Sequence, residues 1–146
     1  MRLVEAYRRL VMDLDPAVHQ PAADAWCRWE DAHVDLDDTD PADGFVDPRF
    51  ADPSFRLAFA RQVTHCWAAD SWLGPDELVR GAAAMAPVPC WFIHGGRDRS
   101  SPLDPVERLH AAWPGSQMVV TDDGHGGAAM WAALRAALRA LAVPPT

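Results

Sequence analysis

The sequence contains no lysine, so all 13 of its basic residues are arginines, and 21 acidic residues bring the formal net charge to −8. A surface of this sign repels phosphate backbones and anionic lipids. We therefore expect neither nucleic acid nor a membrane surface as a partner. The same acidity says less about a cationic substrate, because many proteins carry an excess of acidic residues simply to remain soluble.

Cysteine is scarce, and long hydrophobic runs are missing. The three thiols, Cys27, Cys66 and Cys90, are widely spaced and form no C-x-x-C pair. This pattern argues against a zinc ribbon or a disulfide scaffold and favours reduced thiols. The N-terminal segment mixes apolar residues with acids and arginines, unlike a signal peptide, and no stretch approaches membrane-spanning length. The expected location is therefore the cytoplasm.

Residues 2 to about 85 carry the pattern of helices. Apolar residues recur at three- and four-residue steps. The pairs Asp15–Pro16 and Asp52–Pro53 are typical of an N-cap followed by proline at the first helical position. We expect helices over 3–14, from Pro16, from Pro53 and over about 75–84, with a solvated acidic loop over Asp31–Asp47.

Residues 87–142 alternate between strand and helix signals. The apolar run at 90–93 is too short for a helix and is closed by glycines, which suits a buried parallel strand. A helix over 105–113, a second strand over 117–121 and a closing helix over 128–141 complete the pattern. Alternation of this kind is typical of a parallel sheet covered by helices.

Each predicted strand is followed by a loop with one candidate catalytic group, Asp98 after the first strand and His125 after the second. Functional residues of such sheets lie just beyond the carboxyl ends of the strands. A carboxylate bonded to one imidazole nitrogen fixes the tautomer and leaves the other nitrogen free to take a proton from a nucleophile. Taken by themselves, Asp98 could equally be a turn residue and His125 an ordinary loop residue.

Longer segments resemble the proline iminopeptidases, or prolyl aminopeptidases, a family of α/β hydrolases. In the second half these segments are H-G-G-R-D at 94–98, followed by Pro102, H-A-A-W-P at 110–114 and D-G-H at 123–125. In the first half they are A-W-C-R-W-E at 25–30, F-A-D-P at 50–53 and F-R-L-A-F-A-R at 55–61. The resemblance extends from about Leu3 to Leu141.

The resemblance implies an incomplete α/β-hydrolase fold, with residues 1–86 as a helical cap and residues 87–146 as the last parallel strands and helices of the core. It also implies a serine peptidase that releases N-terminal proline from peptides, without a metal or other cofactor. Asp98 falls on the triad acid of the family and His125 on the triad base. Glu30 falls on a cap glutamate that binds the free amine of the substrate.

The sequence departs from the family at the substrate site and at the nucleophile. Val63 stands where the family has a second amine-binding glutamate, and losing that carboxylate should weaken amine recognition by about 1.5–3 kcal/mol. The G-x-S-x-G nucleophile elbow does not occur in these 146 residues. None of the serines lies between glycines, so the chain offers no nucleophile: they are Ser54, Ser71, Ser100, Ser101 and Ser116.

Three interpretations follow. In the first, the chain is a fragment of a prolyl aminopeptidase and is inactive alone. In the second, it is a non-catalytic module, which is either a relic or one half of a split enzyme that pairs with a complementary N-terminal hydrolase half. Alternatively, as Val63 suggests, the substrate is an ester or amide without a free amine. Missing strands would leave an apolar sheet edge exposed, so we expect the chain alone to aggregate or to need a complementary partner.

Overall fold

The computed structural model describes residues 2–34 and 46–142, and these form two compact units, one up to Gly74 and the other from Pro75. The boundary lies there because α4 (Glu77–Ala82) packs against α5 (Asp104–Ala112) of the second unit. The expected division into a cap (1–86) and part of a core (87–146) is a division by role, and it remains a proposal.

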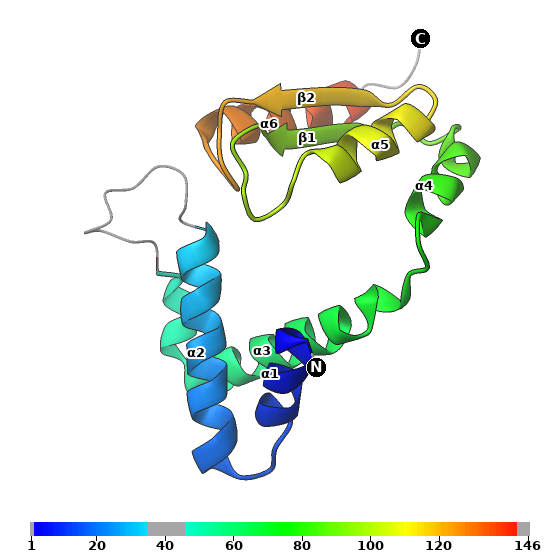
Figure 1. The fold of residues 1–146 in the computed structure, drawn as a ribbon. Coiled ribbons are helices and arrows are strands. Elements are labelled where there is room, and N and C mark those ends of the chain that lie inside the picture. The colour runs from blue at the N-terminus through cyan, green and yellow to red at the C-terminus, as the bar shows by residue number, and fades with distance from the viewer. Residues whose placement is uncertain (1, 35–45, 143–146) are drawn as a thin grey trace. The chain divides into compact units, whose positions relative to one another are not determined.

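The first unit is helical, with α1 (Leu3–Val11), α2 (Pro16–Val34) and α3 (Pro53–Ala68) as its main elements (Figure 1). The predicted start of α3 is confirmed, because the Asp52 carboxylate accepts a hydrogen bond from the Ser54 backbone N–H at 2.8 Å. Such a cap satisfies one of the free N–H groups at a helix start. The short helices η1 (Pro48–Ala51) and η2 (Asp70–Trp72) flank α3.

Two predicted boundaries in this unit are wrong. Helix α1 ends at Val11 and not near residue 14, because Asp13 and Asp15 each accept a backbone N–H two residues ahead, at 2.8 Å, and form a turn before Pro16. Helix α2 continues to Val34, so Asp31 is helical and does not belong to a loop. Residues 35–45 of the predicted acidic loop lie outside the described residues.

The core of the first unit forms where the three helices meet. Its buried members include Val11 of α1, Trp26 of α2 and Ala60 of α3. Small residues at the helix contacts let the backbones approach closely, and the Trp26 ring, which is 4% exposed, fills the remaining space. Trp26 is the only aromatic residue among the described buried members of this core cluster, and Val63 packs against the same cluster.

The second unit contains the predicted parallel strands, β1 (Trp91–Gly95) and β2 (Gln117–Thr121), paired in register from Trp91 with Gln117 to Gly95 with Thr121. Helix α5 lies in front of the strands and α6 (Ala128–Ala142) behind them in Figure 1. Strand–helix–strand–helix order with a parallel pair is a partial α/β fold. Because the last residues of the two strands, Gly95 and Thr121, pair with each other, the carboxyl ends of both strands lie at the same edge of the sheet.

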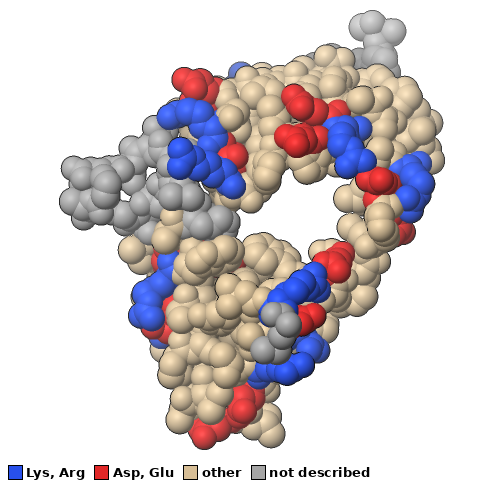
Figure 2. All heavy atoms as spheres, in the orientation of Figure 1, with Lys and Arg blue, Asp and Glu red and all other residues tan. Residues whose placement is uncertain are grey.

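The surface combines mixed charge with exposed apolar groups. Figure 2 shows arginines and acidic residues beside one another on the face in view, and ion pairs such as Arg97 with Asp122 account for part of this mixing. Val120 of β2 is 47% exposed, and Trp131 and Leu138 of α6 are 59% and 56% exposed. None of the helices in residues 2–34 and 46–142 is long and apolar enough to cross a membrane.

Candidate functional site

The loops that follow β1 and β2 are joined by backbone hydrogen bonds. The Gly96 N–H donates to the Thr121 carbonyl at 2.8 Å, and the Arg97 N–H donates to the Asp123 carbonyl at 3.0 Å. These bonds continue the pairing of the strands beyond their ends. The two loops therefore form one rigid unit, and each side chain on them has a defined position relative to the other loop.

Glycine at position 95 is required by this close contact. A Cβ atom added to Gly95 would lie 1.9 Å from the carbonyl oxygen of Gly124, which is a backbone atom. Real Cβ atoms do not approach other atoms so closely, so a larger residue would force the loops apart. Gly95 thus allows the loop that carries His125 to lie directly against the loop that carries Asp98.

The second loop is further held by Asp123. Its carboxylate Oδ2 accepts hydrogen bonds from the Thr121 hydroxyl at 3.2 Å and from the backbone N–H of Met130, in the first turn of α6, at 2.5 Å. A carboxylate here also stabilises the positive end of the helix dipole. Asp123 therefore fixes the path of the chain around His125, and it does not contact the His125 ring in any described hydrogen bond.

The structure brings the two sequence-predicted groups into contact. Nδ1 of His125 lies 3.0 Å from Oδ2 of Asp98. The Asp98 side chain is 5% exposed, whereas the His125 side chain is 46% exposed. The acid is thus enclosed by protein, while the imidazole, bonded through Nδ1, is accessible from the surface. An enclosed carboxylate behind an accessible imidazole is the arrangement that a general base requires.

Sequence reasoning missed the part that Ser100 plays in this site. Its hydroxyl lies 2.8 Å from Oδ1 of Asp98 and 2.6 Å from Nδ1 of His125. Since a carboxylate oxygen can only accept, the hydroxyl donates its proton to Asp98 and accepts from the His125 Nδ1–H. Ser100 therefore connects the acid and the base. The H-G-G-R-D segment at 94–98 carries no signal for such a contact.

The surroundings of Asp98 favour its ionised form. Burial raises the pKa of the carboxyl group, but hydrogen bonds from the Ser101 backbone, the Ser100 hydroxyl and His125 lower it more. The pKa of Asp98 consequently lies below its ordinary value. A carboxylate that is charged at neutral pH can hold the Nδ1–H tautomer of His125 and stabilise the imidazolium that forms when Nε2 takes a proton.

Glu30 and Val63 both lie in the first unit, Glu30 bonded to Trp26 and Val63 packed against the core cluster that contains it. The Trp26 Nε1–H donates to Oε1 of Glu30 at 3.0 Å, which orients the carboxylate. Val63 is partly buried and packs against the core cluster that contains Trp26. Position 63 thus belongs to an apolar contact. The Trp29 and Trp67 rings, 45% and 43% exposed, adjoin Trp26 at centroid distances of 5.2 and 5.8 Å.

Two of the three cysteines, Cys27 and Cys90, do not have the lowered pKa of an activated nucleophile. Burial raises the pKa of the Cys27 thiol to about 12, and burial also raises the pKa of Cys90. Only the thiolate is nucleophilic, so both thiols are inert near neutral pH. All three cysteines are free. Within the described residues, no group of three or more histidine, cysteine, aspartate or glutamate side chains is arranged to hold a metal ion.

Comparisons with known proteins support the resemblance. No family model matches the sequence. The chain is 42% identical over 128 residues to a probable proline iminopeptidase of Streptomyces coelicolor, a match that covers 84% of this chain and 38% of the relative. It is 35% identical over 129 residues to a proline iminopeptidase of Xanthomonas citri (84% and 39% covered) and 27% identical over 125 residues to one of Neisseria gonorrhoeae (85% and 38% covered).

These matches show that the chain belongs, over the matched residues, to the proline iminopeptidase family. It spans less than two fifths of the length of the three relatives named above.

Proposed function

We propose that this chain contributes the acid, the base and an amine-binding carboxylate to a prolyl aminopeptidase-type serine hydrolase whose nucleophile lies outside these 146 residues. The observation that carries the proposal is the 3.0 Å contact between Asp98 and Nδ1 of His125, beyond the carboxyl ends of two adjacent parallel strands. The relatedness to proline iminopeptidases supports the same assignment.

In the proposed reaction, His125 acts through Nε2. This nitrogen takes the proton of a serine hydroxyl as the oxygen attacks the carbonyl carbon of the N-terminal residue, and later gives it to the leaving amine of the second residue. Asp98 keeps Nδ1 protonated and stabilises the imidazolium by its charge. Ser100, bound to the same Nδ1, is not placed to be this serine, because a nucleophile has to contact the opposite nitrogen.

Glu30 is the proposed partner of the substrate's ammonium group. A carboxylate can accept a hydrogen bond from an ammonium group, and a hydrogen bond between charged groups is worth about 1.5–3 kcal/mol. Recognition of a free amine would restrict the enzyme to the first residue of a peptide. The role of Glu30 follows from its place in the A-W-x-x-W-E segment, and its hydrogen bond with Trp26 supports a fixed orientation.

A complementary segment is part of the proposal. Within the described residues, β1 and β2 pair only with each other, so each has an outer edge with free N–H and C=O groups. Strand edges of this kind pair readily with further strands. The exposed Trp131 and Leu138 of α6 add apolar surface that a further layer would cover. These features support a partner segment that completes the sheet, and in the proposal the same segment carries the nucleophile.

The test is complementation. The chain is co-expressed with the part of the Streptomyces coelicolor relative that it does not match, and the complex is assayed with the 7-amido-4-methylcoumarin derivative of proline. We expect turnover by the complex and none by either part alone. In the complex, Asp98→Asn and His125→Gln should each lower kcat by about a thousandfold or more, because removing any triad member leaves only a small residual rate.

Asp122→Asn is the matched control. Asp122 lies in the same loop as His125, but its side chain is 96% exposed and pairs with Arg97. This variant should retain kcat within about twofold, as exposed ion pairs contribute little. If Asp98→Asn retains the same kcat as Asp122→Asn, Asp98 is not the triad acid and the proposal fails.

Val63 favours a second candidate, a hydrolase for an ester or amide without a free amine. Position 63, where the resemblance implies a second amine-binding glutamate, carries a valine. Its apolar side chain packs against the core cluster that contains Trp26. The active complex decides between the two by kcat/KM for the proline amide and for its N-acetyl derivative. Preference for the free amine supports the peptidase, whereas equal or greater turnover of the N-acetyl compound supports the second candidate.

A further inference from the structure

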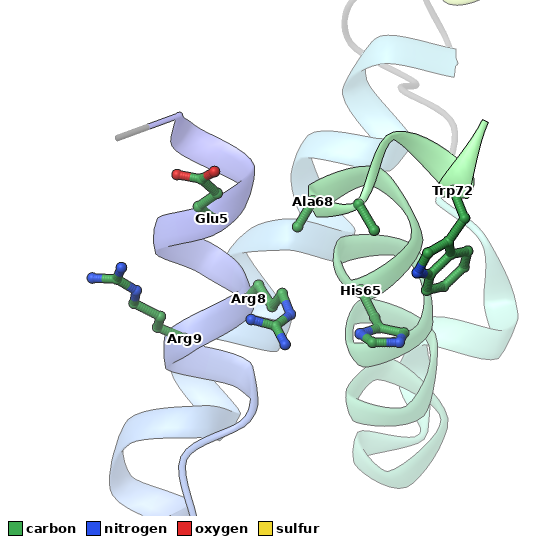
Figure 3. A pocket seen from close by; sticks show the side chains of 7 residues that line it. Glu5, Arg8, Arg9, His65, Ala68 and Trp72 are labelled. Carbon is green, nitrogen blue, oxygen red and sulfur yellow. The ribbon is translucent and has the colours of Figure 1, made fainter. Parts of the chain in front are cut away.

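A cavity of about 430 Å³ lies in the first unit, between α1 and the end of α3 with η2. It shares no residue with the pair Asp98 and His125 or with Glu30. Figure 3 shows the side chains of seven residues that line it: Glu5, Arg8, Arg9, His65, Ala68, Ala69 and Trp72. The composition combines cations, an imidazole and an indole around a floor of small apolar side chains.

The charged residues that line this cavity, Glu5, Arg8 and Arg9, sum to one positive charge. The Arg8 and Arg9 side chains form no ion pair or side-chain hydrogen bond within the described part of the chain. The acids nearby are already engaged by Arg2, whose guanidinium contacts Asp70 at 2.7 Å and Glu5 at 3.6 Å. In a chain with a net charge of −8, two arginines without an acidic partner make this cavity a local attraction for anions.

The two arginines are placed differently. In Figure 3, Arg8 extends from α1 toward α3, which carries His65, whereas Arg9 extends away from α3. Arg8 and His65 can therefore donate hydrogen bonds to one anionic group between the helices. A guanidinium offers two parallel N–H donors that match the two oxygens of a carboxylate.

One wall of the cavity is the Trp72 indole, which belongs to a segment with positive φ angles. Asp70, Ser71 and Trp72 have φ angles of 46°, 53° and 57°, a left-handed conformation that costs L residues roughly 1–2 kcal/mol each. Arg2 holds this segment by donating to the Ala68 carbonyl at 2.8 Å. The result is that the Trp72 ring contacts His65 at a centroid distance of 5.2 Å yet stays 63% exposed. Strain of this kind persists where the surrounding structure enforces it.

We propose that this cavity binds a small carboxylate that carries an apolar or aromatic group. Arg8 and His65 bind the carboxylate oxygens, and the exposed face of Trp72 covers the apolar group. A monoanion is favoured over a phosphate dianion because Glu5 lines the cavity, and its carboxylate repels a second negative charge.

The probe is benzoate, titrated into the 146-residue chain while ¹H–¹⁵N NMR spectra record the Trp72 indole and the amides of residues 65–72. Arg8→Gln should weaken benzoate binding by about fivefold or more. Arg9→Gln, which removes the same charge from the next residue, should change the affinity by less than about twofold. The spectra of the variants also report whether each is folded.

Two further ligands separate the sources of affinity. Benzamide, which has the ring without the charge, should bind weakly, and inorganic phosphate should bind less tightly than benzoate. Equal loss in both arginine variants, equal binding of benzamide, tighter binding of phosphate, or shifts that are not centred on residues 65–72 would each overturn the proposal.

Discussion

The Ser100 hydroxyl lies 2.6 Å from Nδ1 of His125, the same nitrogen that Asp98 contacts at 3.0 Å. The hydroxyl also donates to the second oxygen of Asp98. Acid, base and serine therefore form a closed ring of hydrogen bonds on one side of the imidazole. A Ser–His–Asp triad requires the serine and the acid on opposite nitrogens, so in this site Ser100 supports the acid.

The first prediction concerns this support. Ser100→Ala should raise the pKa of Asp98, because the variant removes a hydrogen bond that favours the carboxylate. Ser101→Ala is the control, since Ser101 contributes its backbone N–H to Asp98 and keeps it in the variant. A ¹³C NMR titration of the Asp98 carboxyl group measures both. An unchanged Asp98 titration in Ser100→Ala would show that the hydroxyl does not stabilise the acid.

The second prediction concerns the contact between the loops. Gly95→Ala places a methyl group against the Gly124 carbonyl and should lower the free energy of unfolding by about 1–3 kcal/mol, as overpacking does. Gly126→Ala adds the same group next to His125, where no atom lies within 4 Å, and should change stability by less than about 0.5 kcal/mol. Urea denaturation measures both, and equal effects would contradict the close contact.

The third prediction concerns the amine site. Val63→Glu restores a carboxylate near the Trp26 cluster. In the complemented enzyme, we expect it to lower KM for the proline substrate by about tenfold, the equivalent of one charged hydrogen bond. Because position 63 is partly buried, the variant should also be less stable by about 1–3 kcal/mol. Val63→Gln matches its size without the charge, so a similar KM for both variants would exclude amine recognition at this position.

The fourth prediction concerns alkaline pH. Folding raises the pKa of Cys27 to about 12, whereas a thiol in the unfolded chain ionises near pH ~8.5. The contribution of this group to stability is therefore complete below pH ~8.5 and is lost as the pH rises toward 12. Denaturation at pH 7.5 and pH 10 should show a smaller loss of stability in Cys27→Ala than in the wild type. Equal losses would mean that Cys27 ionises as easily in the folded chain as in the unfolded one.

Features set by local chemistry could be predicted from the sequence. The cap of α3 at Asp52 follows from an aspartate–proline pair, and β2 has the predicted bounds because an apolar run is flanked by turn residues. The contact between Asp98 and His125 was also foreseeable, because adjacent parallel strands end at one edge of the sheet.

Features set by competing side-chain bonds could not be predicted in this way. Apolar periodicity extends through Leu14, but the bonds of Asp13 and Asp15 end α1 at Val11. The contact of Ser100 with His125 depends on the path of a loop, which no spacing pattern encodes. The cavity beside Arg8 depends on three left-handed residues, none of which is a glycine.

The central claim is that Asp98 and His125 serve a nucleophile that lies outside these 146 residues. Labelling with a fluorophosphonate, read by intact mass, tests it most directly. The account predicts no adduct on this chain, either alone or in the complex, and an adduct on the complementary segment that forms far more slowly with His125→Gln. A stoichiometric adduct on a serine of this chain would contradict the account.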